Sequence, residues 1–234
     1  PIVSMSLLKY FSKKRPSKTL RFIFISETIG SIAYLAKNLK FLKKNVEGGF
    51  NLTCIGDERN HSCLLSKNAN TATDESLIQA YKKLKIGKFK IHSFLERGSD
   101  ERQYNSPGID LPIASIFRTK YGCYPEYHNS DDNFNLVTLN GITGGFNVAK
   151  TAIENLLQKI VPKYKNLCEP QMGRRNLYPN LSKININFSS RKLMDFLQFS
   201  DGVSSLEMIA SKINLDINAT KKIYLKLKKA RLVY

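Results

Sequence analysis

The residues with the clearest chemical potential are one histidine and several carboxylates that follow apolar runs. The stretch EYHNSDDN, residues 126–133, places His128 between a glutamate and two aspartates, and the chain has only three histidines. Other carboxylates stand after apolar runs at Glu27, Asp57 and Asp100. Imidazole and carboxylate groups bind zinc and transfer protons. The set therefore indicates metal-assisted or acid–base chemistry, although a polar loop histidine would look the same.

The elements that must position these side chains alternate between helical and extended patterns. Apolar side chains at helical spacing predict helices at residues 2–14, 29–45, about 74–85 and 141–161. Apolar runs predict buried strands at residues 20–26, 48–56, 89–94 and 111–117, and residues 57–72 are predicted to be irregular. This alternation favours an α/β domain built on a parallel sheet.

In an open parallel α/β sheet, sites form in the loops beyond the carboxyl ends of the strands. The candidates occupy such loops after four different predicted strands: Glu27, then Asp57, then Asp100, Glu101 and Arg102, and finally Tyr127 and His128. We therefore expect several carboxylates and one imidazole on the same side of the sheet.

Four motifs in the same order resemble known peptidases. ETIGSIAYL, NLTCIG, GSDERQYNSPGIDLPIASI and EYHNSDDN resemble segments of the zinc aminopeptidases related to glutamate carboxypeptidase and the transferrin receptor. A closer resemblance, on ERQYNSPG, DLP, YPEYH and CEPQMGRRNLYP, is to a bacterial aminopeptidase-like family associated with polysaccharide biosynthesis, which ends in a winged helix. This resemblance covers nearly the whole chain and implies a three-layer α/β/α sheet domain followed by a small winged-helix-like domain.

The resemblance also implies roles for individual residues. His128 would be a zinc ligand and Glu27 a ligand or the general base. Thr53 stands where the wider superfamily has a ligand aspartate, so Asp57 would have to take that role. The residues expected to support the ligands or contact the substrate are Asp100, Glu101, Arg102, Tyr104 and Tyr127. The superfamily's first histidine and bridging aspartate precede the helix that opens this chain, so the chain is expected to be N-terminally incomplete.

Three functions are compatible with these features. The first is metal-assisted hydrolysis of a peptide or amide bond. The second is a binding or scaffolding protein that keeps the fold without catalysis. The third, less favoured, is a DNA-binding regulator that acts through its C-terminal helices. His61 and His92 are expected to be structural.

Composition limits the remaining choices. The formal net charge is +18, but the lysines are spread along the chain except in residues 221–234, which hold six Lys/Arg and no acid. The spread of the lysines favours a generally lysine-rich protein as the explanation of the charge, rather than a dedicated surface for nucleic acid. The four cysteines form no CxxC pair. With no signal-peptide pattern and no apolar run of about 20 residues, a cytoplasmic protein without a membrane span is expected.

A change in composition at Pro162 predicts the domain organisation. Residues 1–161 would form the aminopeptidase-like domain, residues 162–187 a proline-rich linker, and residues 188–234 the winged-helix-like domain, with helices at 189–199, 204–212 and 216–229. The sequence leaves the oligomeric state open, and a homo-oligomer is compatible with it.

Overall fold

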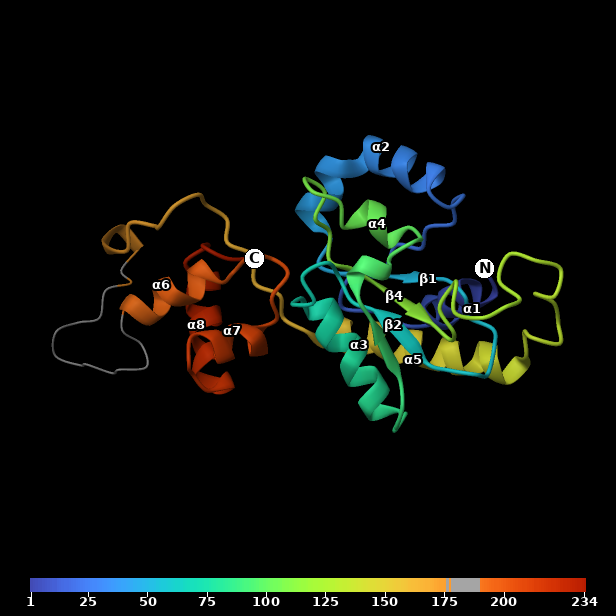
Figure 1. Cartoon of the computed structure of the whole chain (residues 1–234). Coiled ribbons are helices and arrows are strands. Elements are labelled where there is room, and N and C mark those ends of the chain that lie inside the picture. The colour runs from blue at the N-terminus through green and yellow to red at the C-terminus, as the bar shows by residue number, and fades with distance from the viewer. Residues whose placement is uncertain (176, 178–189) are drawn as a thin grey trace. The chain divides into compact units, whose positions relative to one another are not determined.

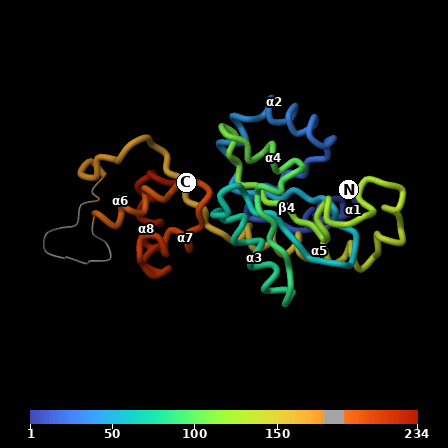
Figure 2. The backbone as a smooth tube through the Cα atoms, viewed as in Figure 1, coloured from blue at the N-terminus to red at the C-terminus, as the bar shows by residue number. Residues whose placement is uncertain are grey.

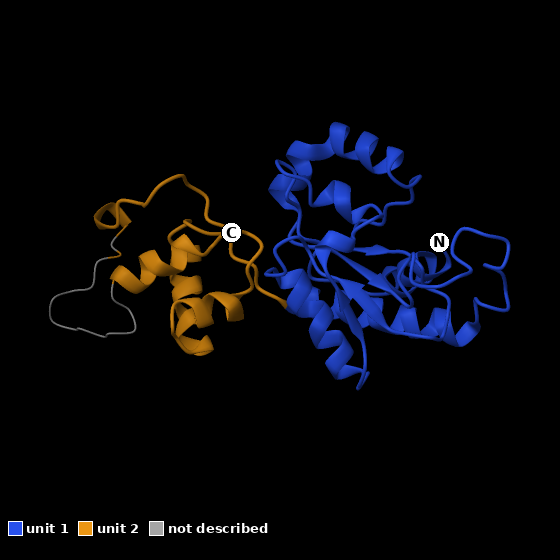
Figure 3. Cartoon of the chain, viewed as in Figure 1, with its two compact units in different colours: residues 1–158 blue, residues 159–234 orange. Residues whose placement is uncertain are grey.

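The chain contains two compact units, Pro1–Gln158 and Lys159–Tyr234, coloured separately in Figure 3. The computed structural model describes residues 1–175, 177 and 190–234. The second half of the predicted linker therefore lies largely outside the described residues. No helix in the described part of the chain is both long and apolar enough to cross a membrane.

A four-stranded sheet forms the centre of the first unit. Its strands are β1 (Gly49–Leu52), β2 (Ser62–Leu64), β3 (Lys90–His92) and β4 (Ile113–Phe117), in the order β1-β4-β2-β3. β1 is parallel to β4 and β2 is parallel to β3, but β2 and β4 are antiparallel. The sheet is therefore mixed, which corrects the expectation of an all-parallel sheet, and β2 lies in a region that was predicted to be irregular.

Helices cover both faces of this sheet and give the expected three layers. On one face lie α3 (Ala72–Lys83) and α5 (Leu139–Gln158), and α1 (Ile2–Ser12) packs with them around one apolar core. On the other face lie α2 (Ile29–Asn45) and the short α4 (Glu101–Tyr104), as Figure 1 shows. The 3-10 turn η1 (Phe94–Glu96) follows β3. The tube view in Figure 2 follows the chain through these layers.

The start of α3 shows how local chemistry fixes a helix boundary. The N-cap is Thr71, whose side chain accepts a hydrogen bond from the backbone N–H of Asp74, and the Asp74 carboxylate in turn accepts from the Thr71 N–H. This reciprocal capping box satisfies two backbone donors that the first turn would otherwise leave unpaired. Asp74 is therefore the third residue of the helix, which begins two residues before its predicted start.

The predicted strand at residues 20–26 is wrong. Leu20 and Phe22 pack against the core, whereas Ile23, Phe24 and Ile25 are exposed. Within the described chain, no backbone hydrogen bond joins residues 19–25 to any other residue. The run has strand composition, but a strand also needs a neighbour to supply its ladder of hydrogen bonds.

In the described part of the second unit, three helices surround a separate core. These are α6 (Ser190–Gln198), α7 (Leu206–Lys212) and α8 (Ile217–Lys229), and the 3-10 turn η2 (Gly173–Arg175) precedes them. Fully buried side chains on all three helices, such as Phe196, Ile209 and Ile223, form the core. Isolated bridges pair Lys163 with Asp201 and Tyr164 with Val233, so the start of the predicted linker is bound into this unit.

Candidate functional site

Glu27 and His128 are both exposed, and both interact with the same tyrosine, His128 by stacking and Glu27 through its charge. Glu27 stands just before α2, and the His128 ring stacks on that of Tyr127 with centroids 3.9 Å apart and planes 17° from parallel. Burial raises the pKa of Tyr127, and negative charge on Cys54 and on Glu27 raises it further. The Glu27 carboxylate therefore acts on the aromatic ring that supports His128, although about a hundred residues separate the two in sequence.

The loop after β3 fixes the turn that carries Glu27. Asp100 Oδ1 accepts a hydrogen bond from the backbone N–H of Thr28 at 2.7 Å, and Arg102 Nη2 donates to Thr28 Oγ1 at 2.7 Å. Thr28 has a φ of 62°, in the left-handed region that is uncommon for residues other than glycine. Asp100 and Arg102 thus hold a strained residue directly beside Glu27.

Glu101 is fully buried and serves as a hub of hydrogen bonds. Its Oε1 accepts from the backbone N–H groups of Gly98 and Ser99 and from the Tyr121 hydroxyl, at 2.8–3.0 Å. Its Oε2 accepts from Asn51 on β1 and Ser115 on β4. Burial alone would raise the pKa of Glu101, but the hydrogen bonds outweigh it and the net pKa lies below the ordinary value. Glu101 therefore joins two strands to the loop of Asp100 without reaching solvent.

Asp57 is buried, and both of its carboxylate oxygens are already engaged. Oδ1 accepts from the Arg59 N–H at 2.9 Å and from the Thr119 hydroxyl at 2.6 Å, and Oδ2 accepts from the Thr119 N–H at 2.8 Å. The same loop packs closely on α5, because a Cβ on Gly141 would lie 1.8 Å from the Gly56 carbonyl oxygen. Asp57 thus ties the loop after β1 to the residues after β4.

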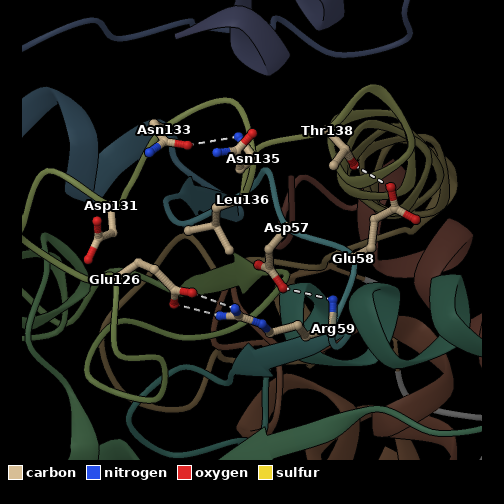
Figure 4. Close-up of a pocket in the computed structure, with 9 residues that line it drawn as sticks. All are labelled: Asp57, Glu58, Arg59, Glu126, Asp131, Asn133, Asn135, Leu136 and Thr138. Atoms are coloured by element: carbon tan, nitrogen blue, oxygen red, sulfur yellow. Dashed lines mark hydrogen bonds and ion pairs between the residues drawn. The ribbon is translucent and has the colours of Figure 1, made fainter.

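A polar pocket lies next to this loop, and Figure 4 shows its lining residues. Across it, Arg59 makes two hydrogen bonds to the Glu126 carboxylate, at 2.6 and 2.8 Å. This contact lowers the pKa of Glu126 to about 2. The pair anchors the segment that carries Tyr127 and His128, a contact that sequence reasoning missed because nothing in the spacing of residues 59 and 126 indicates it.

The remaining predicted residues have structural contacts. Tyr104 packs against the apolar cluster between α2 and the residues before β4. His61 Nε2 lies 2.7 Å from Nη1 of the buried Arg118, and burial together with that positive charge lowers the pKa of His61 to about 4. His92 is buried and its Nδ1 contacts Glu96.

These contacts decide how well the residues fit a zinc ion. A zinc site in a protein usually has three or four side-chain ligands. Glu27 and His128 expose suitable donors, but both oxygens of the buried Asp57 already accept hydrogen bonds, and Thr53 offers only a hydroxyl, which lies 3.8 Å from the Cys54 sulfur. No group of three His, Cys, Asp or Glu residues able to hold a metal occurs in the part of the chain that the structure describes. The described residues therefore do not complete a zinc site.

The chain matches the models of two known protein families. Residues 1–159 match the family described as "Domain of unknown function (DUF4910)". The chain belongs to this family. Residues 159–234 match a winged helix-turn-helix family, as the resemblance had predicted for the C-terminus.

A curated relative from Clostridium acetobutylicum carries a more specific description. It is provisionally named a polysaccharide biosynthesis protein with an aminopeptidase-like domain, and it is 32% identical over 219 residues, which cover 92% of this chain and 49% of the relative. The chain thus spans about half the length of the curated relative it matches. The resemblance to an aminopeptidase-like family linked to polysaccharide biosynthesis is confirmed.

Solved structures support the fold. A crystal structure from C. acetobutylicum, provisionally described as a peptidase, has a TM-score of 0.65 at 28% identity and covers 99% of this chain and 52% of its own. An aminopeptidase from Aneurinibacillus sp. strain AM-1 has a TM-score of 0.57 at 19% identity, covering 66% and 37%. A zinc aminopeptidase from Bacillus subtilis has a TM-score of 0.55 at 17% identity, covering 64% and 39%. The likeness to the last two concerns the fold alone.

Proposed function

We propose that this chain takes part in aminopeptidase-like hydrolysis of a peptide or amide bond, in a process linked to polysaccharide biosynthesis. The observation that supports this most strongly is that Glu27 and His128 are both exposed and both interact with Tyr127, His128 by ring stacking and Glu27 through its charge. The description of the relative and the fold of the zinc aminopeptidases point to the same class of reaction.

In this proposal Glu27 is the general base. Its carboxylate takes a proton from a water molecule as the water oxygen attacks the carbonyl carbon, and the proton then passes to the leaving amine as the C–N bond breaks. Asp100 and Arg102 hold the adjacent Thr28 and so limit where the Glu27 side chain can reach. Zinc would stabilise the developing oxyanion in this class of enzyme. The described residues leave its coordination incomplete, so the proposal rests on Glu27 and His128.

The test is hydrolysis of aminoacyl arylamides by the purified chain with zinc in excess. We expect slow turnover that Glu27→Gln reduces by about 100-fold or more, because removal of a general base typically costs that much. His128→Ala should also reduce the rate. Since both side chains are exposed, neither change should shift the melting temperature.

Asp132→Asn is the matched control, because Asp132 is an exposed carboxylate in the same loop as His128. Its rate should equal that of the unmodified chain. Turnover that Glu27→Gln leaves unchanged would contradict the proposed role of Glu27.

A second candidate is a binding or scaffolding protein that holds a peptide without cleaving it. Two observations favour it: Thr53 replaces a carboxylate ligand of the wider superfamily, and Asp57 is committed to Thr119 and Arg59. Saturable binding of an aminoacyl amide with no turnover at any zinc concentration would support this candidate over the first.

A further inference from the structure

The chain exposes five large apolar side chains immediately around Glu27, which we call the apolar strip. They are Ile23, Phe24, Ile25, Ile29 and Ile32, exposed by 38%, 53%, 39%, 77% and 51%. The two ends of the turn lie close together, because the Ile25 Cβ lies only 2.8 Å from where a Cβ on Gly30 in α2 would stand. Exposed apolar patches of this kind usually mark an interaction surface.

The backbone of the same region lacks partners. In the described chain, residues 19–25 make no backbone hydrogen bond, and β1 is an edge strand whose only neighbour in the sheet is β4. Leu20 and Phe22 pack on the same apolar core as Phe50 and Leu52 of β1. A β-rich run and an open sheet edge therefore flank one core, which is the arrangement that accepts an added strand.

The relatives indicate what covers this region. The chain spans 49% of the curated relative and 52% of the crystal structure with the TM-score of 0.65. Those proteins therefore hold about as much polypeptide again as the part that they share with this chain.

We propose that the apolar strip and the outer edge of β1 bind an extended apolar polypeptide segment, the counterpart of the half of these relatives that this chain does not span. The bound segment supplies backbone hydrogen bonds to the sheet edge and covers Phe24 and its neighbours. Since Glu27 stands between Ile25 and Ile29, the segment lies directly beside the candidate site.

The test uses as probe the unmatched half of the C. acetobutylicum relative, produced as a separate polypeptide and mixed with the full chain. We expect a one-to-one complex by size exclusion with light scattering, and slowed amide hydrogen exchange in residues 19–26 and 49–52. Phe24→Asp should weaken the complex at least ~10-fold, as expected for loss of a central aromatic anchor. The measurement needs no turnover, so it is independent of the proposed hydrolysis.

Leu95→Asp is the matched control, because Leu95 is 86% exposed on η1. It should leave the complex unchanged, and both variants should melt at the temperature of the unmodified chain. Three results would overturn the proposal: no complex, a complex equally tight with Phe24→Asp, or a dimer of the chain alone that Phe24→Asp dissociates.

Discussion

Replacing Glu101 with alanine is expected to lower the free energy of unfolding by on the order of 4 kcal/mol, since a buried donor without an acceptor costs about 1–3 kcal/mol. The change leaves the backbone N–H groups of Gly98 and Ser99 without their side-chain acceptor and removes one acceptor each from Tyr121, Asn51 and Ser115. Urea unfolding followed by circular dichroism measures the loss. Glu126→Ala is the control, because its pair with Arg59 is partly exposed and the change should cost less than the loss of the buried Glu101 carboxylate.

The pH dependence of stability gives a second readout for Glu101. The folded protein holds the pKa of Glu101 below its ordinary value of 4.5, so the folded state favours the charged carboxylate. Its contribution is fully present above pH 4.5 and is lost as the pH falls through the folded-state pKa. Glu101→Gln should flatten this part of the stability curve relative to the unmodified chain. An unchanged curve, or a cost below about 1 kcal/mol for Glu101→Ala, would show that the carboxylate is not a structural hub.

Gly141→Ala is expected to destabilise the first unit by about 3 kcal/mol, the upper end of the usual cost of overpacking. Alanine is ordinarily better than glycine inside a helix by about 1 kcal/mol. Here the new Cβ would lie 1.8 Å from the Gly56 carbonyl oxygen and 2.7 Å from that of Asp57, so helix and loop must move apart. Thermal unfolding measures the effect.

Gly87→Ala is the matched control, because a Cβ there meets no atom within 4 Å. We expect a change within about 0.5 kcal/mol at that position. If Gly141→Ala proved as stable as Gly87→Ala, the close packing of α5 on the loop after β1 would be refuted.

Helices were predictable from the sequence because their apolar spacing is local information. The pattern over residues 29–45 gives the exact bounds of α2, and α5 begins within two residues of its predicted start. Strand pairing depends on contacts between distant parts of the chain, so the order and direction of the strands could not be predicted from local patterns. The connection from β1 to β2 holds no helix, so it lacks the crossover that parallel strands require, and β2 instead runs antiparallel to β4.

In the candidate site, too, the sequence identifies some residues, whereas the roles of others depend on contacts that only the fold shows. Glu27 and His128 stand out by residue type and by their position after apolar runs. The buried state of Asp57 and Glu101 depends on Thr119, Tyr121, Asn51 and Ser115, which reach them from other parts of the chain. A carboxylate that binds a metal and one that binds backbone N–H groups look identical in a sequence, so only the fold separates them.

Zinc binding to the purified chain tests the account of this site most directly. We expect isothermal titration and elemental analysis, after purification without chelators, to find well under one tightly bound zinc per chain. The residual binding should disappear in His128→Ala and persist in His92→Ala, whose ring is buried against Glu96. One tightly bound zinc per chain that survives His128→Ala would contradict both the assignment of His128 and the incompleteness of the site.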